Sequence, residues 1–192
     1  VSVLVNGDMS DGIALSERDF HTNFLLLVVA GNETTRHTIS HTMINLIQNP
    51  DQLTKLQENP ELIPWAVEEF LRFASPVYHF RRTATKDVEI HGQSIKSGEK
   101  IVTWFASGNR DSSIFERANK FDVTRNPNEH MTFGRGGPHM CLGNALARIE
   151  LRVMFEDLIS RIDSMELTGP VDYLRSNFVH GIKRMPVRVK LR

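Results

Sequence analysis

The sequence predicts a mainly α-helical protein with small antiparallel β-sheets, and three segments carry this prediction. Residues 16–48 contain no proline and are compatible with one long helix. Residues 82–105 combine β-branched and aromatic side chains with glycines as turn signals, a pattern typical of short antiparallel strands. Residues 142–162 repeat apolar side chains at helical spacing. Because the sequence shows no internal repeat or flexible linker, we expect one unit over residues 1–192.

The first long helix is expected to begin at Ser16, because Asp19 follows it at the spacing of a helix-capping signature. The middle of this helix, Phe24–Ala30, is apolar on every side. A helix of that kind is buried all round, and we therefore expect other segments to cover both of its flanks.

Shorter elements are expected between the two long helices. A helix is predicted at Asp51–Glu58, and another begins near Pro64, a residue favoured in the first helical turn. Residues 108–128 mix Asp, Asn, Pro and Arg with few apolar side chains and are expected to be irregular. The helix over 142–162 is expected to bury one face, made of Leu142, Leu146, Ile149, Val153, Leu158 and Ile162.

Composition argues against several classes of partner. Lys+Arg and Asp+Glu both number 23, so the net charge gives no support for binding to nucleic acid or to an anionic membrane. The longest apolar run, 24–30, is far shorter than the ~20 residues of a membrane-spanning helix, and no leader pattern opens the chain. A single cysteine cannot form an internal disulfide. We therefore expect a soluble, cytoplasmic protein.

The strongest functional signal is the segment Phe133-Gly-Arg-Gly-Gly-Pro-His-Met-Cys141-Leu-Gly143. Its glycines allow the backbone to approach a flat cofactor, and the helix that follows places its positive end near the sulfur, which favours thiolate over thiol. Otherwise a lone cysteine is usually a small buried hydrophobe, and that alternative stays open. Zinc is disfavoured, because only His139 and His130 lie near Cys141 as further ligands. Haem iron, by contrast, needs one axial thiolate.

A second signal interrupts the apolar helix at Ala30-Gly31-Asn32-Glu33-Thr34-Thr35. Glycine inside a helix costs roughly 1 kcal/mol relative to alanine, and a buried polar group without a partner costs about 1–3 kcal/mol. One explanation is local, with the Thr34 hydroxyl donating back to the Ala30 carbonyl. The other is a widened turn that admits dioxygen, with Thr34 donating to the distal oxygen and Glu33 passing protons from solvent.

A third signal is the pair Glu69 and Arg72, one helical turn apart and able to form an ion pair. Such a pair contributes little on a surface. In this order, however, the three signals together resemble the cytochrome P-450 family of haem-thiolate monooxygenases, in its bacterial soluble type. The family's oxygen-binding helix motif matches Ala30, Gly31, Glu33 and Thr34, and its Glu-x-x-Arg motif matches Glu69 and Arg72, with Arg125 completing that triad.

The resemblance implies that residues 1–192 are the C-terminal haem-binding part of a P-450 domain whose N-terminal half is absent. It implies haem b, with the iron axially ligated by Cys141. It implies that Arg82, with adjacent Arg81 as a competitor, and His139 bind the haem propionates. The other residues that it assigns to cofactor binding are Phe133, Gly134, Gly143, Ala30 and Gly31. Glu33 and Thr34 would be catalytic, and Glu69, Arg72 and Arg125 structural.

The activity implied by the resemblance is insertion of one oxygen atom from dioxygen into an apolar small molecule, with electrons from a ferredoxin or flavodoxin-type donor. Residues 76–80 and 177–179 fall where the family lines its substrate pocket, although core packing also explains them. Phe133 stands eight residues before Cys141, one more than in the commonest family pattern. Some bacterial members share this longer loop, and they include enzymes that act on terpenes, sterols and lipid chains, so we expect a bulky apolar substrate here.

The electron donor would approach the cysteine side, where Arg135, Arg148 and Arg152 are candidates to meet an acidic protein. The alternative for these arginines is an ordinary solvated helix face.

Two further alternatives concern the whole chain. It begins at Val1, inside an apparent helix over 1–5, and as a fragment it would lack activity and stable haem binding and associate through exposed apolar surface. The second alternative is a peroxide-driven peroxygenase, which has less need of a proton-delivering pair. Glu33 and Thr34 argue against it.

Overall fold

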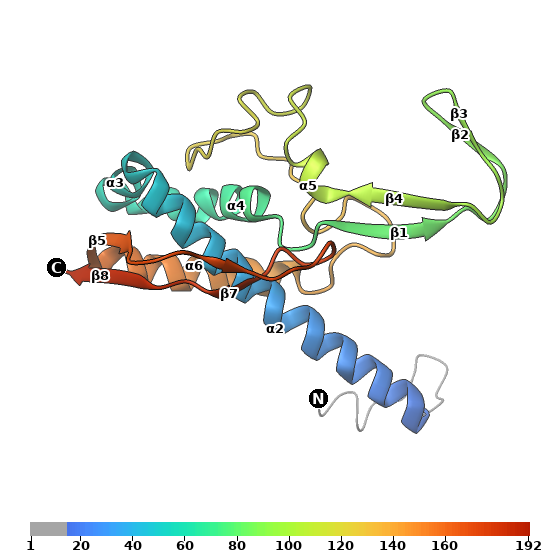
Figure 1. Cartoon of the computed structure of the whole chain (residues 1–192), viewed down its shortest axis with the longest axis horizontal. Helices are drawn as coiled ribbons and strands as arrows, with labels where there is room; N and C mark the ends of the chain where they lie inside the picture. The colour runs from blue at the N-terminus through green and yellow to red at the C-terminus, as the bar shows by residue number, and fades with distance from the viewer. Residues whose placement is uncertain (1–14) are drawn as a thin grey trace.

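The computed structural model describes residues 15–192, so the helix expected over residues 1–5 lies outside the described part. The first described helix, α2 (Glu17–Gln48), begins where the capping signature predicts, with the Ser16 side chain accepting a hydrogen bond from the Asp19 backbone N–H at 3.1 Å. Figure 1 shows the N-terminal half of α2 extending away from the other elements, while its C-terminal half crosses them.

The hydrophobic core lies where the C-terminal half of α2 meets α3 (Pro50–Glu58), the short 3₁₀ helix η1 (Pro60–Leu62), α4 (Ile63–Ala74) and α6 (Asn144–Arg161). The helices at 51–58 and from Pro64 are thus confirmed, with proline in the first turn of α4. Phe70 of α4 packs against Phe155 of α6 with 4.7 Å between ring centroids. The fully buried side chains of this core include Leu46, Leu56, Ile63, Val67, Phe70, Leu151 and Phe155.

The expectation that the apolar run Phe24–Ala30 is buried is wrong for this structure. The large apolar side chains from Phe24 to Val29 are exposed, with Leu25 and Leu26 at 62% and 61%. The physical reason is that none of the segments described between residues 15 and 192 packs against this part of α2 (Figure 1). A run that is apolar on all sides predicts a requirement for cover and does not identify which segment provides it.

The predicted buried face of the last helix is also wrong in part. Leu146, Ile149 and Val153 are exposed on α6, as is Leu142 just before it, whereas the buried side chains are Leu151, Phe155 and Ile159. Leu158 and Ile162 do meet the core as expected. Residues 146, 149 and 153 lie on the opposite side of the helix from residues 151, 155 and 159. The helix therefore carries two apolar stripes, and the sequence pattern did not reveal which one meets the core.

The strands found over residues 15–192 form four two-stranded antiparallel sheets, which confirms the predicted class. β1 (His79–Thr83) pairs with β4 (Lys100–Trp104), and β2 (Val88–Ile90) pairs with β3 (Gln93–Ile95). β5 (Ile162–Leu167) pairs with β8 (Val187–Leu191), and β6 (Asp172–Tyr173) pairs with β7 (Ile182–Arg184). A one-turn helix that was not predicted, α5 (Phe105–Gly108), follows β4, and residues 109–143 are irregular.

Across residues 15–192, the helices are too short or too polar for any of them to cross a lipid bilayer.

Candidate functional site

Cys141 is exposed, in a loop that closes on itself just before α6. Its backbone N–H donates to the Phe133 carbonyl at 2.9 Å, and its own carbonyl accepts from the Asn144 side chain at 2.7 Å. Between these ends the chain turns through a left-handed conformation that L side chains rarely adopt, at Gly134, Gly136 and Gly137. These three glycines of the cysteine signature are therefore required by the backbone of the loop, with φ between 72° and 76°.

The loop rests on a charged cluster that joins three segments. The guanidinium of Arg148 lies 4.7 Å from the Phe133 ring and donates to both carboxylate oxygens of Glu68, at 2.7 and 2.9 Å. His130 Nε2 lies 3.0 Å from Glu68 Oε2. Burial raises the pKa of the Glu68 carboxyl, but the hydrogen bonds from His130 and Arg148 outweigh burial and hold the pKa at about 2. This cluster links α4 to the chain before the loop and to the helix after it.

Sequence reasoning missed Glu68, and it considered His130 only as a possible zinc ligand beside Cys141. Glu68 finds its guanidinium partner 80 residues further along the chain, and no local spacing indicates a pair of that kind. The only signal available was the position of Glu68 beside Glu69 in the Glu-x-x-Arg motif.

The predicted triad is assembled in the structure. Glu69 and Arg72 are fully buried on α4, with Arg72 Nε 2.7 Å from Glu69 Oε2 and Nη2 2.8 Å from Oε1. Arg125 Nε donates to Glu69 Oε2 at 3.1 Å. Arg72 also donates to the carbonyls of Asn109 and Ala118, at 2.6 and 2.8 Å. Since every charge has a partner, the desolvation cost of burying the pair is offset, and the irregular segment is held against α4.

The segment that resembles the family's oxygen-binding motif lies in α2, where Ala30 and Gly31 are exposed and Glu33 and Thr34 are half-buried. The helix is regular α-helix through Ala30, Gly31 and Thr34, so the widened turn that the functional interpretation required is absent from this segment. The Thr34 hydroxyl donates to the Ala30 carbonyl at 2.7 Å, as the local alternative predicts. A Cβ added at Gly31 would meet nothing within 4 Å. Within residues 15–192, then, packing does not require glycine at this position.

Glu33 is paired with two side chains of its own helix. Its Oε2 accepts from Arg36 and lies 3.0 Å from Nε2 of His37. The hydrogen bond from Arg36 lowers the pKa of the Glu33 carboxyl below its usual value, although the partial burial of Glu33 opposes this shift. Glu33 is therefore ionised at neutral pH.

The two residues expected to bind propionates are both exposed. Arg82 lies in β1, where its Nη1 donates to the Arg81 carbonyl at 3.1 Å and its guanidinium lies 5.9 Å from the Phe80 ring. His139 lies in the cysteine loop, two residues before Cys141. Among the described side chains, none of the carboxylates is within ion-pair distance of Arg81, Arg82 or His139. These donors are thus available to anionic groups from outside.

The two segments expected to line a substrate pocket come together. Val77 and Val179 form an antiparallel bridge, and the Tyr78 N–H donates to the Phe178 carbonyl at 2.9 Å. The rings of Phe80 and Phe178 make an edge contact, with centroids 5.7 Å apart. An apolar surface therefore joins residues 76–80 to residues 177–179.

The cations expected to face an electron donor are all paired. Arg148 binds Glu68 as described above, Arg135 binds Glu129, and Arg152 binds Glu156. This part of the surface carries both signs of charge and is not a purely positive patch.

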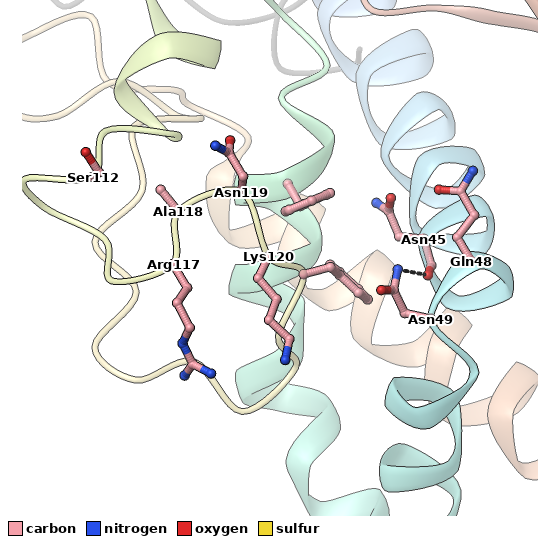
Figure 2. Close-up of a pocket in the computed structure, with 10 residues that line it drawn as sticks. Asn45, Gln48, Asn49, Ser112, Arg117, Ala118, Asn119 and Lys120 are labelled. Carbon is pink, nitrogen blue, oxygen red and sulfur yellow. Dashed lines mark hydrogen bonds between the residues drawn. The ribbon is translucent and has the colours of Figure 1, made fainter.

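Two pockets of the described part of the chain have no lining residue in the segment Ala30–Thr34. The larger, of about 740 Å³, lies between the C-terminal end of α2 and residues 112–121, and Figure 2 shows polar side chains of both segments around it. It contains none of the predicted site residues. The smaller, of about 250 Å³, lies beside the cysteine loop and is lined by Phe133, Gly134, Met140 and Arg148 among others. Over residues 15–192, the histidine, cysteine, aspartate and glutamate side chains form no group of three or more placed to hold a metal ion.

The donor set around Cys141 fits the haem that the resemblance implies. One exposed sulfur is the single protein ligand that a haem iron requires. A Cβ added at Gly136, Gly137 or Gly143 would meet nothing within 4 Å, so the loop leaves space for a flat group to approach its backbone. Arg82 and His139 supply exposed donors suited to carboxylates.

Comparison with known proteins gives the same family. The model of the family described as Cytochrome P450 matches residues 1–189. Linalool 8-monooxygenase of Pseudomonas putida is 48% identical over 186 residues, which are 97% of this chain and 45% of that protein. The methyl-branched lipid omega-hydroxylase of Mycobacterium tuberculosis is 46% identical over 187 residues, 97% of this chain and 44% of that protein. The chain thus spans less than half the length of these relatives.

Solved structures share the fold over the same extent. Mycobacterium marinum cytochrome P450 CYP268A2 in complex with pseudoionone superposes with a TM-score of 0.92 at 45% identity, covering 97% of this chain and 45% of that one. Substrate-free CYP109E1 from Bacillus megaterium superposes with a TM-score of 0.91 at 37% identity, covering 100% of this chain and 50% of that one. With a matching family model over nearly its whole length and the fold shared throughout, this chain belongs to the cytochrome P450 family.

Proposed function

We propose that this chain provides the haem-thiolate part of a monooxygenase and that Cys141 is the axial ligand to the iron of haem b. The observation that carries the proposal is the exposed thiol at the end of a loop that three left-handed glycines and the Cys141 to Phe133 hydrogen bond hold closed before α6. When bound, the haem supplies the iron at which dioxygen is reduced and one oxygen atom is transferred to a C–H bond.

The residues of this chain bind and orient the cofactor. Cys141 presents its exposed sulfur three residues before the first residue of α6. The Arg148 guanidinium holds the Phe133 ring and, through it, the other end of the loop. Arg82 and His139 are exposed donors that would receive the two propionates.

Glu33 and Thr34 are proposed to move protons toward dioxygen. The Thr34 hydroxyl now donates to the Ala30 carbonyl, so it must rotate away from that carbonyl before it can donate to dioxygen. Glu33 is an ionised carboxylate with a side-chain exposure of 46%, which allows it to accept a proton from water and pass it on.

The proposed substrate is a bulky apolar molecule of the terpene, sterol or lipid class. The apolar contact between residues 76–80 and 177–179 supports it. Relatives support it through their names, since they include a linalool 8-monooxygenase, a methyl-branched lipid omega-hydroxylase and a steroid C26-monooxygenase of Mycobacterium tuberculosis that is 44% identical over 190 residues.

The proposed electron donor is a ferredoxin or a flavodoxin-type protein that docks beside the cysteine loop, in the cytoplasm. Because the arginines there are paired with carboxylates, we expect docking to depend only modestly on ionic strength.

The test is a carbon monoxide difference spectrum of the 192-residue chain after reconstitution with haem and reduction. A haem with thiolate ligation absorbs far to the red of a haem with histidine ligation, and we expect the red-shifted band in the wild-type chain and its loss in Cys141→Ser. Met140→Leu, a neighbour in the same loop, is the matched control and should keep the band. The same haem ligation in wild type and Cys141→Ser would overturn the proposal.

A second candidate is an inactive fragment that associates through its apolar surface. The exposed side chains of Phe24–Val29 and the exposed stripe of Leu146, Ile149 and Val153 favour it. Sedimentation of the haem-free chain tests this candidate. Concentration-dependent association together with failure to take up haem supports it, whereas a haem-binding monomer excludes it.

A further inference from the structure

His37 lies directly between the proposed proton-delivering acid and a C-terminal strand. It stands one turn after Glu33 on α2, and its side chain is only 3% exposed. Nδ1 of the imidazole accepts from the backbone N–H of Ile182, the first residue of β7, at 3.2 Å. Nε2 lies 3.0 Å from Oε2 of Glu33. Both ring nitrogens therefore have a partner: Nδ1 contacts the backbone of β7, and Nε2 contacts the carboxylate of Glu33.

These contacts determine which nitrogen carries the proton. A backbone N–H can only donate, so Nδ1 of His37 must be the unprotonated acceptor, and the proton of a neutral ring lies on Nε2. Burial lowers the pKa of His37 below its ordinary value, and the charge of Arg36 adds to this shift against the opposing effect of Glu33. The ring is therefore neutral at pH 7, with Nε2–H pointed at the Glu33 carboxylate.

The close approach of β7 to His37 depends on Gly181. A Cβ at position 181 would lie 3.1 Å from Nε2 of His37 and 2.9 Å from Cβ of Leu174. Only glycine lets the backbone come near enough for the next residue, Ile182, to reach the imidazole. Gly181 follows the 177–179 segment, so the same stretch of chain contributes apolar surface and supports His37.

The two partners of Glu33 differ in rigidity. Arg36 is 54% exposed and holds Glu33 from the solvent side. His37 is buried and held by the backbone of another element. The other ionisable groups near His37 are His41 and His180, whose pKa values are both lowered by burial, so they bring no positive charge at neutral pH.

We propose that His37 is a positioning residue for Glu33, and that it fixes the direction of the carboxylate through an Nε2–H donor whose tautomer is set by the Ile182 N–H. This inference rests on the proposed function, in which Glu33 passes protons. Arg36 stabilises the negative charge of the Glu33 carboxylate from the solvent side. His37 orients that carboxylate, because its imidazole is held in place by the backbone N–H of Ile182.

The first experiment is a long-range ¹⁵N correlation spectrum of the imidazoles in the 192-residue chain at pH 7, which needs no variant. We expect the neutral Nε2–H tautomer at His37. A ring protonated on Nδ1, alone or on both nitrogens, would overturn the inference.

The second experiment compares two substitutions that each keep one nitrogen position. The amide nitrogen of glutamine falls near Nε2 and that of asparagine near Nδ1. His37→Gln should therefore keep the donor to Glu33, and its Glu33 carboxyl should titrate as in wild type. In His37→Asn the Glu33 pKa should rise toward its ordinary value. His41→Gln is the matched control, because His41 is also buried on α2 but donates to the His180 carbonyl, at 2.9 Å. Identical Glu33 titrations in all four proteins would overturn the inference.

A readout on the haem-loaded protein separates this inference from the proposed function. We expect Glu33→Gln and His37→Asn both to lower the yield of product per electron, and His37→Gln to restore it. If Glu33→Gln leaves the yield unchanged while the spectra show the Nε2–H tautomer, the proton-delivery role of Glu33 is overturned and the positioning contact stands. If Glu33→Gln lowers the yield and His37→Asn does not, the positioning role is overturned.

Discussion

Glu68 on α4 binds Arg148 on α6 through both carboxylate oxygens, across 80 residues of sequence. The pair holds the Arg148 guanidinium against Phe133, whose carbonyl closes the cysteine loop. The geometry of the loop therefore depends on residues outside the cysteine signature.

Glu68→Gln is expected to destabilise the chain by about 2 kcal/mol, because hydrogen bonds to charged groups contribute ~1.5–3 kcal/mol and Arg148 loses an ionised partner. Urea denaturation followed by circular dichroism measures this loss. Glu150→Gln, an exposed glutamate of the same helix as Arg148, is the control and should change stability by less than about 0.5 kcal/mol. Equal effects of the two substitutions would contradict the role assigned to Glu68.

Arg72→Lys is expected to cost about 3–5 kcal/mol, because lysine cannot reproduce the paired contacts with Glu69 or the contacts with buried carbonyls. The measurement is the midpoint and slope of urea unfolding. Arg161→Lys removes a guanidinium from an exposed pair with Asp157 and should be nearly neutral. A small effect at Arg72 would show that the triad is not a structural requirement.

The stability of the chain is expected to fall between pH 6.5 and pH 4. Burial, with a contribution from His180, lowers the pKa of His41 to about 4 in the folded state. Below pH 6.5 the unfolded chain binds a proton that the folded chain rejects, so this histidine removes about 3 kcal/mol of stability by pH 4 and nothing above pH 6.5. Thermal unfolding across this range measures the loss. His41→Gln should flatten the profile, and an unchanged slope would refute the assignment.

Thr34→Ala is expected to leave stability within about 0.5 kcal/mol of wild type, because the lost hydroxyl bond to Ala30 is offset by the higher helix propensity of alanine. Product formation with dioxygen in the haem-loaded protein should slow on the order of 100-fold. Hydrogen peroxide should still support product formation. Thr34→Ser is the control that keeps the hydroxyl. Unchanged coupling of electrons to product in Thr34→Ala would favour the peroxygenase alternative.

Local signals in the sequence predicted local structure well. The Ser16 to Asp19 cap, the proline in the first turn of α4 and the glycines of the cysteine loop each act within a few residues, and the structure shows all three. The Glu69 to Arg72 spacing likewise predicts a pair within one helix.

Features that depend on distant contacts were not predictable from spacing. The partnership of Glu68, His130 and Arg148 joins three segments, and the contact of His37 with Ile182 spans 145 residues. The two apolar stripes of α6 have similar hydrophobicity, so the stripe that meets the core is decided by tertiary packing. The apolar run of α2 indicated a need for cover, which residues 15–192 do not supply.

The division of α2 into a packed half and an exposed half implies two rates of hydrogen exchange along one helix. From His37 onward the helix packs against the core, and its amides should exchange only through global unfolding. Toward Glu17 the stability of the helix depends on the intrinsic helix propensity of its residues. Val28 and Val29, which are β-branched, and the flexible Gly31 are poor helix formers. The amides of this half should therefore exchange through local fraying. Any molecule that binds the exposed half would slow hydrogen exchange at the amides it covers, and the protected residues would map its binding site.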